Sequence, residues 1–122
     1  MPLHLKAKTG YGGFIMFAFS DKAEVKNLGG GISRQILSHA ENMMAVRVIF
    51  DKGAIGAVHT HPHSQISYVL KGKFEANIGG EVRIITVGDT YYTEPDLPHG
   101  VVCLEAGELL DIFTPERKDF LA

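Results

Sequence analysis

The stretch GAIGAVHTHPHSQISYVLKG, from Gly53 to Gly72, decides the fold prediction, because it holds three of the six histidines of the chain within five residues. Side chains two residues apart point to the same face of a β-strand. His59, His61 and Gln65 share this parity with Val69. If Val69 faces the core, the two histidines and the glutamine are therefore expected to face it too.

Buried imidazoles need polar partners, and one metal ion satisfies several of them at once. His99 precedes the apolar run VVCL and is a third candidate ligand. His63 follows Pro62, which interrupts strand pairing, so it is left open between a pocket-wall residue and a plain turn residue. His4 and His39 are expected to be ordinary hydrogen-bonded or exposed histidines.

Composition narrows the function classes. The chain has 122 residues, which favours one domain, and its net charge is −2, with 12 Lys and Arg against 14 Asp and Glu. No basic block stands out, which argues against nucleic acid and anionic membranes as partners. The apolar run FIMFAF, 14–19, is too short to span a membrane and lacks the features of a signal peptide. A single cysteine, Cys103, permits no intramolecular disulfide and fits a reducing compartment, so a cytoplasmic location is expected.

Many short apolar segments separated by glycine-containing turns predict an all-β sandwich or barrel. At most a turn is expected after Pro115. The expected turns include KGK at 71–73 and AG at 106–107. The expected strands are Phe14–Phe19, Ile32–Ser38, Met43–Asp51, Gln65–Leu70, Phe74–Ile78, Val82–Val87, Thr90–Thr93, Val101–Leu104 and Leu109–Phe113.

The segment MMAVRVIFD, Met43–Asp51, is apolar at both odd and even positions except at Arg47. A strand that is apolar on both faces needs two neighbours, such as the opposite sheet and a second subunit. A homodimer is therefore predicted, and a fully internal strand is the alternative.

The spacing of these residues resembles the first motif of the cupins, small double-stranded β-helix (jelly-roll) barrels that carry a metal in their mouth. The matching residues are Gly53, His59, His61, Gln65 and Gly72. In the second motif, Gly88 and His99 keep the spacing of eleven, but Cys103 replaces the usual Asn. The resemblance implies a single-domain cupin over residues 1–122, with about 1–13 an N-terminal extension of unknown role.

Gln65 stands where the cupin motif has Glu. Three neutral imidazoles and a neutral amide would leave the full charge of an ion uncompensated, which makes it a stronger Lewis acid and favours an anionic substrate. The ligand types permit Zn, Ni, Fe, Co or Mn and do not choose among them.

The C-terminal segment offers further candidates. Leu109, Asp111 and Phe113 share one face of an apolar strand, so the carboxyl group of Asp111 is expected to have a shifted pKa. Asp111 is either a general acid or base near the metal or is simply paired with a neighbouring donor such as Arg117. Arg117 itself either binds a carboxylate or is a solvated surface residue. Arg34, in GGGISR, is a further anion-binding candidate.

The segments NLGGGISRQIL, HTHPHSQISYVLKG and LLDIFTPERKDFL together resemble the bacterial pectin-degradation cupins of the KdgF type. That resemblance implies a cupin, usually dimeric, that converts 4,5-unsaturated monouronates from pectin or alginate into the linear 5-keto-4-deoxyuronate, an isomerase-like step of carbohydrate metabolism. It also implies that His59, His61, Gln65 and His99 bind the metal. The substrate site would be formed by Asp111, Phe113 and Arg117.

Two other classes remain open. A cupin with three histidines can be a metal-dependent dioxygenase, which metal identity and oxygen uptake would reveal. The domain can also be a non-catalytic sugar-binding cupin, in which Asp111→Asn would leave ligand affinity intact. Fold alone decides none of this.

Overall fold

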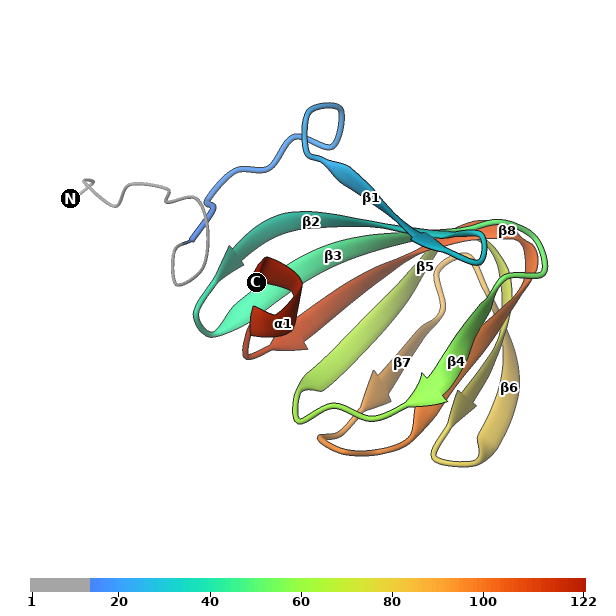
Figure 1. Cartoon of the computed structure of the whole chain (residues 1–122). Helices are drawn as coiled ribbons and strands as arrows, with labels where there is room; N and C mark the ends of the chain where they lie inside the picture. The colour runs from blue at the N-terminus through green and yellow to red at the C-terminus, as the bar shows by residue number, and fades with distance from the viewer. Residues whose placement is uncertain (1–13) are drawn as a thin grey trace.

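A computed structural model describes residues 14–122, and the predicted N-terminal extension, 1–13, lies outside the described residues. The described chain is almost entirely antiparallel β-structure, which confirms the predicted all-β class (Figure 1). None of its helices is long and apolar enough to cross a membrane. The elements are β1 (Val25–Gly29), β2 (Ile32–Ala40), β3 (Met43–Phe50), β4 (Ile55–His59), β5 (Ser64–Ile78), β6 (Glu81–Thr86), β7 (Thr90–Thr93), β8 (His99–Thr114) and α1 (Lys118–Leu121).

Two long strands, β5 and β8, organise the sheet. They pair with each other along almost their whole length, from Ser64 opposite Thr114 to Ile78 opposite His99. At one end they are flanked by β3 and β7, and at the other end by β4 and β6. In Figure 1 the strands curve around a shared interior, with β1 to β3 on one side and β4, β6 and β7 on the other.

The interior is filled by the alternating apolar side chains of these strands. One cluster contains Phe50, Val69, Phe74 and Leu109, and a smaller one contains Met44, Val46 and Phe113 beside α1. The expected inward orientation of Val69 is confirmed, since this side chain is fully buried. Its parity carries Gln65 and Ser67 into the interior as well.

Two predicted turns, at 71–73 and 106–107, are wrong because β5 and β8 each run straight through them. Gly72 and Gly107 lie where the two strands touch backbone to backbone. A Cβ on Gly72 would lie 2.5 Å from the carbonyl oxygen of Glu105, and one on Gly107 would lie 2.2 Å from that of Lys71. The pairing shifts register here. The glycines therefore mark close contact and a bulge inside long strands.

The predicted N-terminal strand, Phe14–Phe19, is also wrong: only Ile15 forms an isolated bridge, to His39. Two strands were missed. All five residues of β1 are exposed, so it carries no alternating apolar pattern. In β4, which is five residues long, only Gly56 is partly buried. Short exposed strands are stabilised by their neighbours, which local sequence does not reveal.

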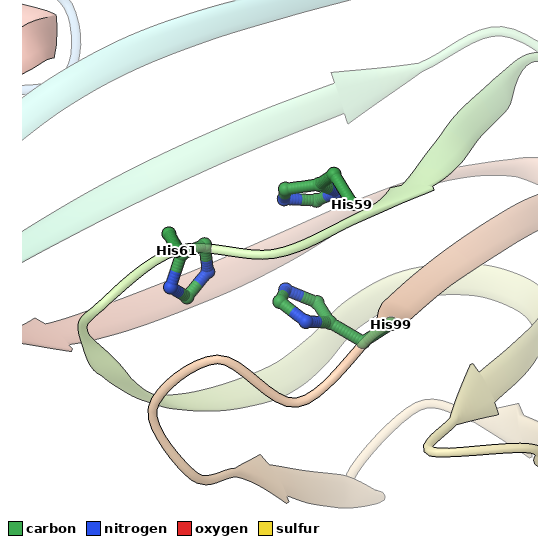
Figure 2. Close-up of side chains that lie close together, drawn as sticks. All are labelled: His59, His61 and His99. Carbon is green, nitrogen blue, oxygen red and sulfur yellow. The ribbon is translucent and has the colours of Figure 1, made fainter.

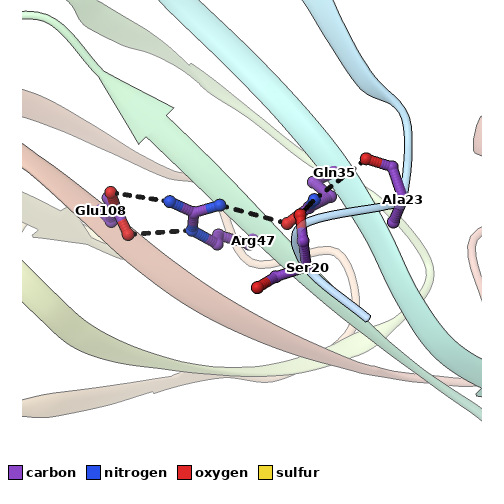
Figure 3. Close-up of polar contacts among 5 residues, drawn as sticks. All are labelled: Ser20, Ala23, Gln35, Arg47 and Glu108. Carbon is purple, nitrogen blue, oxygen red and sulfur yellow. Dashed lines mark hydrogen bonds and ion pairs between the residues drawn. The ribbon is translucent and has the colours of Figure 1, made fainter. Parts of the chain in front are cut away.

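The outer face of the sheet carries a polar network (Figure 3). Arg47 on β3 donates two hydrogen bonds, each of 2.9 Å, to the carboxylate of Glu108 on β8, and a third of 3.2 Å to Gln35 on β2. The fully buried Gln35 in turn donates to the carbonyl oxygens of Ser20 and Ala23. The network thus fastens the segment before β1 to the sheet and neutralises the only charge within MMAVRVIF.

Candidate metal centre and substrate pocket

Three histidines converge at one end of the interior (Figure 2). His59 is the last residue of β4, His99 is the first residue of β8, and the two are paired across these strands. His61 follows in the loop before β5. One ring nitrogen of each lies within 4.8 Å of those of the other two. The predicted histidine cluster is therefore assembled by the fold.

A close strand crossing places His59 beside His99. A Cβ on Gly100 would lie 2.8 Å from the carbonyl oxygen of Gly56 and 2.9 Å from the backbone nitrogen of Val58. Real Cβ atoms do not approach other atoms this closely, so position 100 accepts only glycine without a shift of β4. The glycine lets the two strand ends, and with them the two imidazoles, come together.

The outer ring nitrogens of two histidines are fixed by the backbone. Nδ1 of His59 lies 2.9 Å from the carbonyl oxygen of Ala57, and Nδ1 of His99 lies 2.8 Å from that of Leu97. Since a carbonyl oxygen only accepts, each Nδ1 carries the proton and each Nε2 keeps a free lone pair. This arrangement is typical of metal-ligating histidines. Nε2 of His99 is buried and has no hydrogen-bond partner among the described residues.

His61 and Gln65 complete the donor set. Nε2 of His61 lies 2.9 Å from Oε1 of Gln65, and Nδ1 of His61 is buried without a partner in the described chain. Two ligand atoms that each lie about 2.1 Å from one ion at a right angle are about 3.0 Å apart. Burial lowers the pKa of His61 and of His99, which favours the neutral imidazole that metals bind. The donor set therefore fits a divalent transition metal.

One histidine departs from the expectation. His61 and His99 are buried, but His59 is exposed, because β4 ends at the rim of the interior. His63 leaves the cluster, as Pro62 suggested: its Nε2 lies 3.2 Å from the carbonyl oxygen of Glu116. His39 is an ordinary buried histidine, as predicted, with Nδ1 3.0 Å from the carboxylate of Glu116.

A chain of hydrogen bonds leads from the cluster to Asp111. Nε2 of Gln65 donates to Oγ of Ser67 over 2.8 Å, and this hydroxyl donates to Oδ1 of Asp111 over 2.6 Å. The chain fixes the Gln65 amide with its oxygen toward His61. Burial raises the pKa of Asp111 to about 6, although the hydrogen bond from Ser67 opposes the shift. Asp111 is thus a carboxyl group that can gain and lose a proton near neutral pH.

Arg117 is neither exposed nor paired with Asp111. Its side chain is 11% exposed, and its guanidinium donates two hydrogen bonds to Asp119. Its Cζ lies 4.9 Å from the ring centre of Phe113. No hydrogen bond or ion pair joins Asp111 to Arg117 among the described residues, and the neighbouring donor of Asp111 is Ser67 instead. The alternative of a solvated surface arginine is wrong.

A single pocket of about 170 Å³ joins these groups. This volume lies below the range of about 300–1,000 Å³ for drug-sized ligands, so the pocket suits a small molecule. The predicted residues that line it are His59, Gln65, His99, Asp111, Phe113, Arg117 and Arg34.

Three residues to which the sequence assigned no role also belong here. Ser67 shares the parity of Gln65, so its position could have been read from the strand pattern. Tyr91 hydrogen-bonds Ser67, and burial raises the pKa of its hydroxyl. Phe120 also lines the pocket, and no sequence pattern links it to residues so distant in the chain.

Comparison with known proteins agrees with this geometry. The chain belongs to the cupin domain family, which matches residues 46–113. It is 46% identical over 107 residues to the pectin degradation protein KdgF of Dickeya dadantii (strain 3937), covering 86% of this chain and 97% of that protein.

Two solved structures share the architecture. The structure of KdgF from Halomonas sp. has a TM-score of 0.83 and 38% identity, covering 86% of this chain and 97% of the other. An RmlC-like cupin from Shewanella frigidimarina NCIMB 400 has a TM-score of 0.85 and 44% identity, covering 87% and 96%. The predicted resemblance to the KdgF type is confirmed.

Proposed function

We propose that this protein is a metal-dependent enzyme of pectin or alginate breakdown that converts 4,5-unsaturated monouronates into the linear 5-keto-4-deoxyuronate. One observation carries the proposal: two histidines of the cluster, His59 and His99, line a single small pocket together with a buried carboxyl group and two guanidinium groups. The similarity to KdgF of Dickeya dadantii supports the pathway. A monosaccharide carboxylate matches both the size and the positive charge of the pocket.

His59, His61, His99 and Gln65 would hold one divalent metal ion. The unpartnered Nε2 of His99 supports this assignment. When bound, the ion supplies a positive charge that stabilises the oxyanion developing as the sugar ring opens. Zn, Ni, Fe, Co and Mn all suit these donors.

The reaction needs proton transfer and no redox step. Loss of the C1 hydroxyl proton forms the C1 aldehyde and breaks the bond between C1 and the ring oxygen. That oxygen is attached to C5 of the C4=C5 double bond, so the electron pair yields a C5 enolate. Protonation at C4 then gives the 5-keto-4-deoxy product, an isomer of the substrate. A single carboxyl group that takes the first proton and returns one to carbon balances the sequence.

Asp111 is assigned this role of general base and acid. Its pKa of about 6 leaves it deprotonated, and able to accept the hydroxyl proton, just above that pH. Arg117 and Arg34 are assigned to the substrate carboxylate, whose charge they complement. Phe113, which is buried in the core and lines the pocket, would form the apolar wall against the sugar.

The experiment that tests this function follows the ultraviolet absorbance of the C4=C5 bond in 4,5-unsaturated galacturonate. Wild-type protein should remove the absorbance faster than buffer, because ring opening and ketonisation destroy this chromophore. Proton NMR should show a CH2 group at C4 of the linear product. Decay at the spontaneous rate, with metal confirmed in the sample, would refute the proposed reaction.

A homodimer forms part of the proposal. The outer faces of β5 and β7 expose Ile66, Tyr68 and Tyr92, which are 42–56% exposed. Ile66 on β5 pairs with Ile112 on β8 at one side and with Tyr92 on β7 at the other, so the exposed apolar side chains of the three strands adjoin. This continuous patch suits a second copy of the chain. Ile66→Glu should give monomers by light scattering, whereas Ile84→Glu, at an equally exposed position on β6, should not. Dimers of the Ile66 variant would refute this interface.

A cytoplasmic location is proposed from Cys103, a buried free thiol that suits a reducing compartment. A cytoplasmic location also suits a monosaccharide substrate that is released by cleavage of the polymer. Localisation of the protein in the producing cell by fractionation would test it.

A further inference from the structure

Two guanidinium groups share one aromatic ring at the substrate pocket. Cζ of Arg34 on β2 lies 3.8 Å from the ring centre of Phe120, and Cζ of Arg117 lies 4.1 Å from the same centre. Phe120 belongs to α1 and Arg117 is its N-cap residue, so β2 and the C-terminal helix meet here. All three residues line the same pocket as Asp111. Like charges repel, and an aromatic face attracts each cation.

The two arginines differ in what their N–H groups do. Arg117 donates hydrogen bonds from Nε and one Nη to the carboxylate of Asp119. Within residues 14–122 the backbone of Arg34 pairs with β1 and β3, but its side chain makes no hydrogen bond or ion pair. Burial and the nearby charge of Arg117 lower the pKa of Arg34. A guanidinium group held over an aromatic ring keeps N–H donors for other groups, and Arg34 lines the pocket.

The ring of Phe120 also packs against residues of the core. Its ring meets that of Phe113 edge-on, at 5.8 Å and 90°, and it packs on the buried cluster of Met44 and Val46. The position of the ring is therefore set by the core rather than by the arginines. The core, through this ring, can set the position of both guanidinium groups.

We propose that Phe120 is a positioning residue that holds the guanidinium group of Arg34 with its N–H edge free to bind the carboxylate of the substrate. This inference rests on the proposed function for the identity of the substrate. Arg117, already bound to Asp119, would set the second side of the anion site. Phe120 touches neither reacting atom, and its effect passes through Arg34.

The test compares three single variants. Phe120→Leu keeps apolar packing and removes the ring face, Phe120→Tyr keeps the face, and Leu121→Ala loosens α1 without touching either arginine. Phe120→Leu should raise KM for the unsaturated uronate about tenfold, about 1.4 kcal/mol, with little change in kcat. Phe120→Tyr should keep KM near the wild-type value, because the aromatic face remains. Leu121→Ala should lower Tm and leave KM near wild type.

A double-mutant cycle then asks whether Phe120 acts through Arg34. The combination of Arg34→Gln with Phe120→Leu should raise KM little more than Arg34→Gln alone, because the other cation on the ring, Arg117, is already held by Asp119. Additive effects would overturn the proposal. An equal rise of KM in Leu121→Ala would also overturn it, since docking of α1 alone would then explain the effect.

A binding measurement separates this inference from the proposed reaction. Saturated galacturonate carries the carboxylate but has no C4=C5 bond, so its binding by calorimetry does not depend on turnover. Wild-type protein should bind it more tightly than the neutral sugar galactose, and Phe120→Leu should reduce that preference about tenfold. Equal affinities for galacturonate in wild type and Phe120→Leu would overturn the inference even if the enzyme is active.

Discussion

Replacing Asp111 by Asn should stabilise the metal-free protein while removing most of its activity. The carboxyl group of Asp111 is buried, and burial raises its pKa from the ordinary 3.8 to about 6. Asn has nearly the same shape but carries no charge, so it avoids the cost of burying a carboxylate. The carboxyl group of Asp111 is thus predicted to lower the free energy of unfolding of the protein.

The magnitude follows from linkage. A raised carboxyl pKa means that the folded state binds the proton more tightly than the unfolded state. Stability is then fully present below about pH 4 and is lost as pH rises through about 6. The difference between a pKa of 3.8 and one of about 6 corresponds to about 3 kcal/mol. The pKa of about 6 already includes the opposing effect of the hydrogen bond from Ser67, so that bond is not subtracted a second time. The gain of the Asp111→Asn variant at pH 8 should therefore approach about 3 kcal/mol.

Urea unfolding of chelator-treated wild type and Asp111→Asn at pH 4.5 and pH 8 measures this difference. The advantage of the variant should be small at the lower pH and should grow as pH rises. Turnover of the unsaturated uronate should fall about a hundredfold or more, which is the scale of general acid–base catalysis. A constant stability difference across pH, or an unchanged rate, would refute the role of Asp111.

Three further predictions concern the surrounding residues. His61→Ala should lose bound metal, measured by elemental analysis, together with activity, and full activity in the metal-free variant would contradict the ligand set. Gly100→Ala should push β4 away from β8, because the new Cβ meets backbone atoms rather than a flexible side chain. The variant should lose about 1–3 kcal/mol of stability in urea unfolding and bind metal more weakly. Wild-type stability would show that the crossing tolerates a methyl group. Ser67→Ala should raise the pKa of Asp111 further, since the carboxylate loses a donor, so the acidic limb of the kcat profile should move to higher pH. Thr93→Val, which removes a buried hydroxyl that has no partner among the described residues, should leave that limb in place and serves as the control.

The local patterns of the sequence predicted the fold class and the histidine cluster because both depend on short-range spacing. The parity of Gln65 and Val69 on β5 survives in the structure, whereas His61 reaches the cluster from the loop before β5. The cupin motif adds His99. The same local reasoning misassigned Gly72 and Gly107 as turns. A glycine that permits close strand contact looks identical, in sequence, to one that permits a turn.

The part of the site that sequence did not predict depends on contacts between distant elements. Asp119, two residues from Arg117, takes its hydrogen bonds, and no spacing rule favours this partner over Asp111. Phe120 reaches Arg34 only because α1 packs against the sheet, 86 residues away in the chain. Such contacts follow from the assembled core and not from periodicity.

The electrostatics of the pocket also follow from assembly. Asp111 has an unusual pKa because the folded chain excludes water from it, and Ser67 and Arg117 only partly offset that burial. The strand pattern predicted a shifted pKa but could not give its direction, since an ion pair with Arg117 would have lowered it. The direction matters for function, because a pKa near 6 suits a group that both accepts and donates a proton.

The central claim, that the histidine cluster holds a metal which serves uronate ring opening, is tested most directly by a metal titration. Chelator-treated wild-type protein is loaded with increasing amounts of one divalent metal, and bound metal and the rate of loss of the C4=C5 absorbance are measured in the same samples. The rate should rise in proportion to bound metal and stop rising at one ion per chain. A rate that is independent of bound metal, or saturation of binding with no rate above the spontaneous reaction, would contradict it.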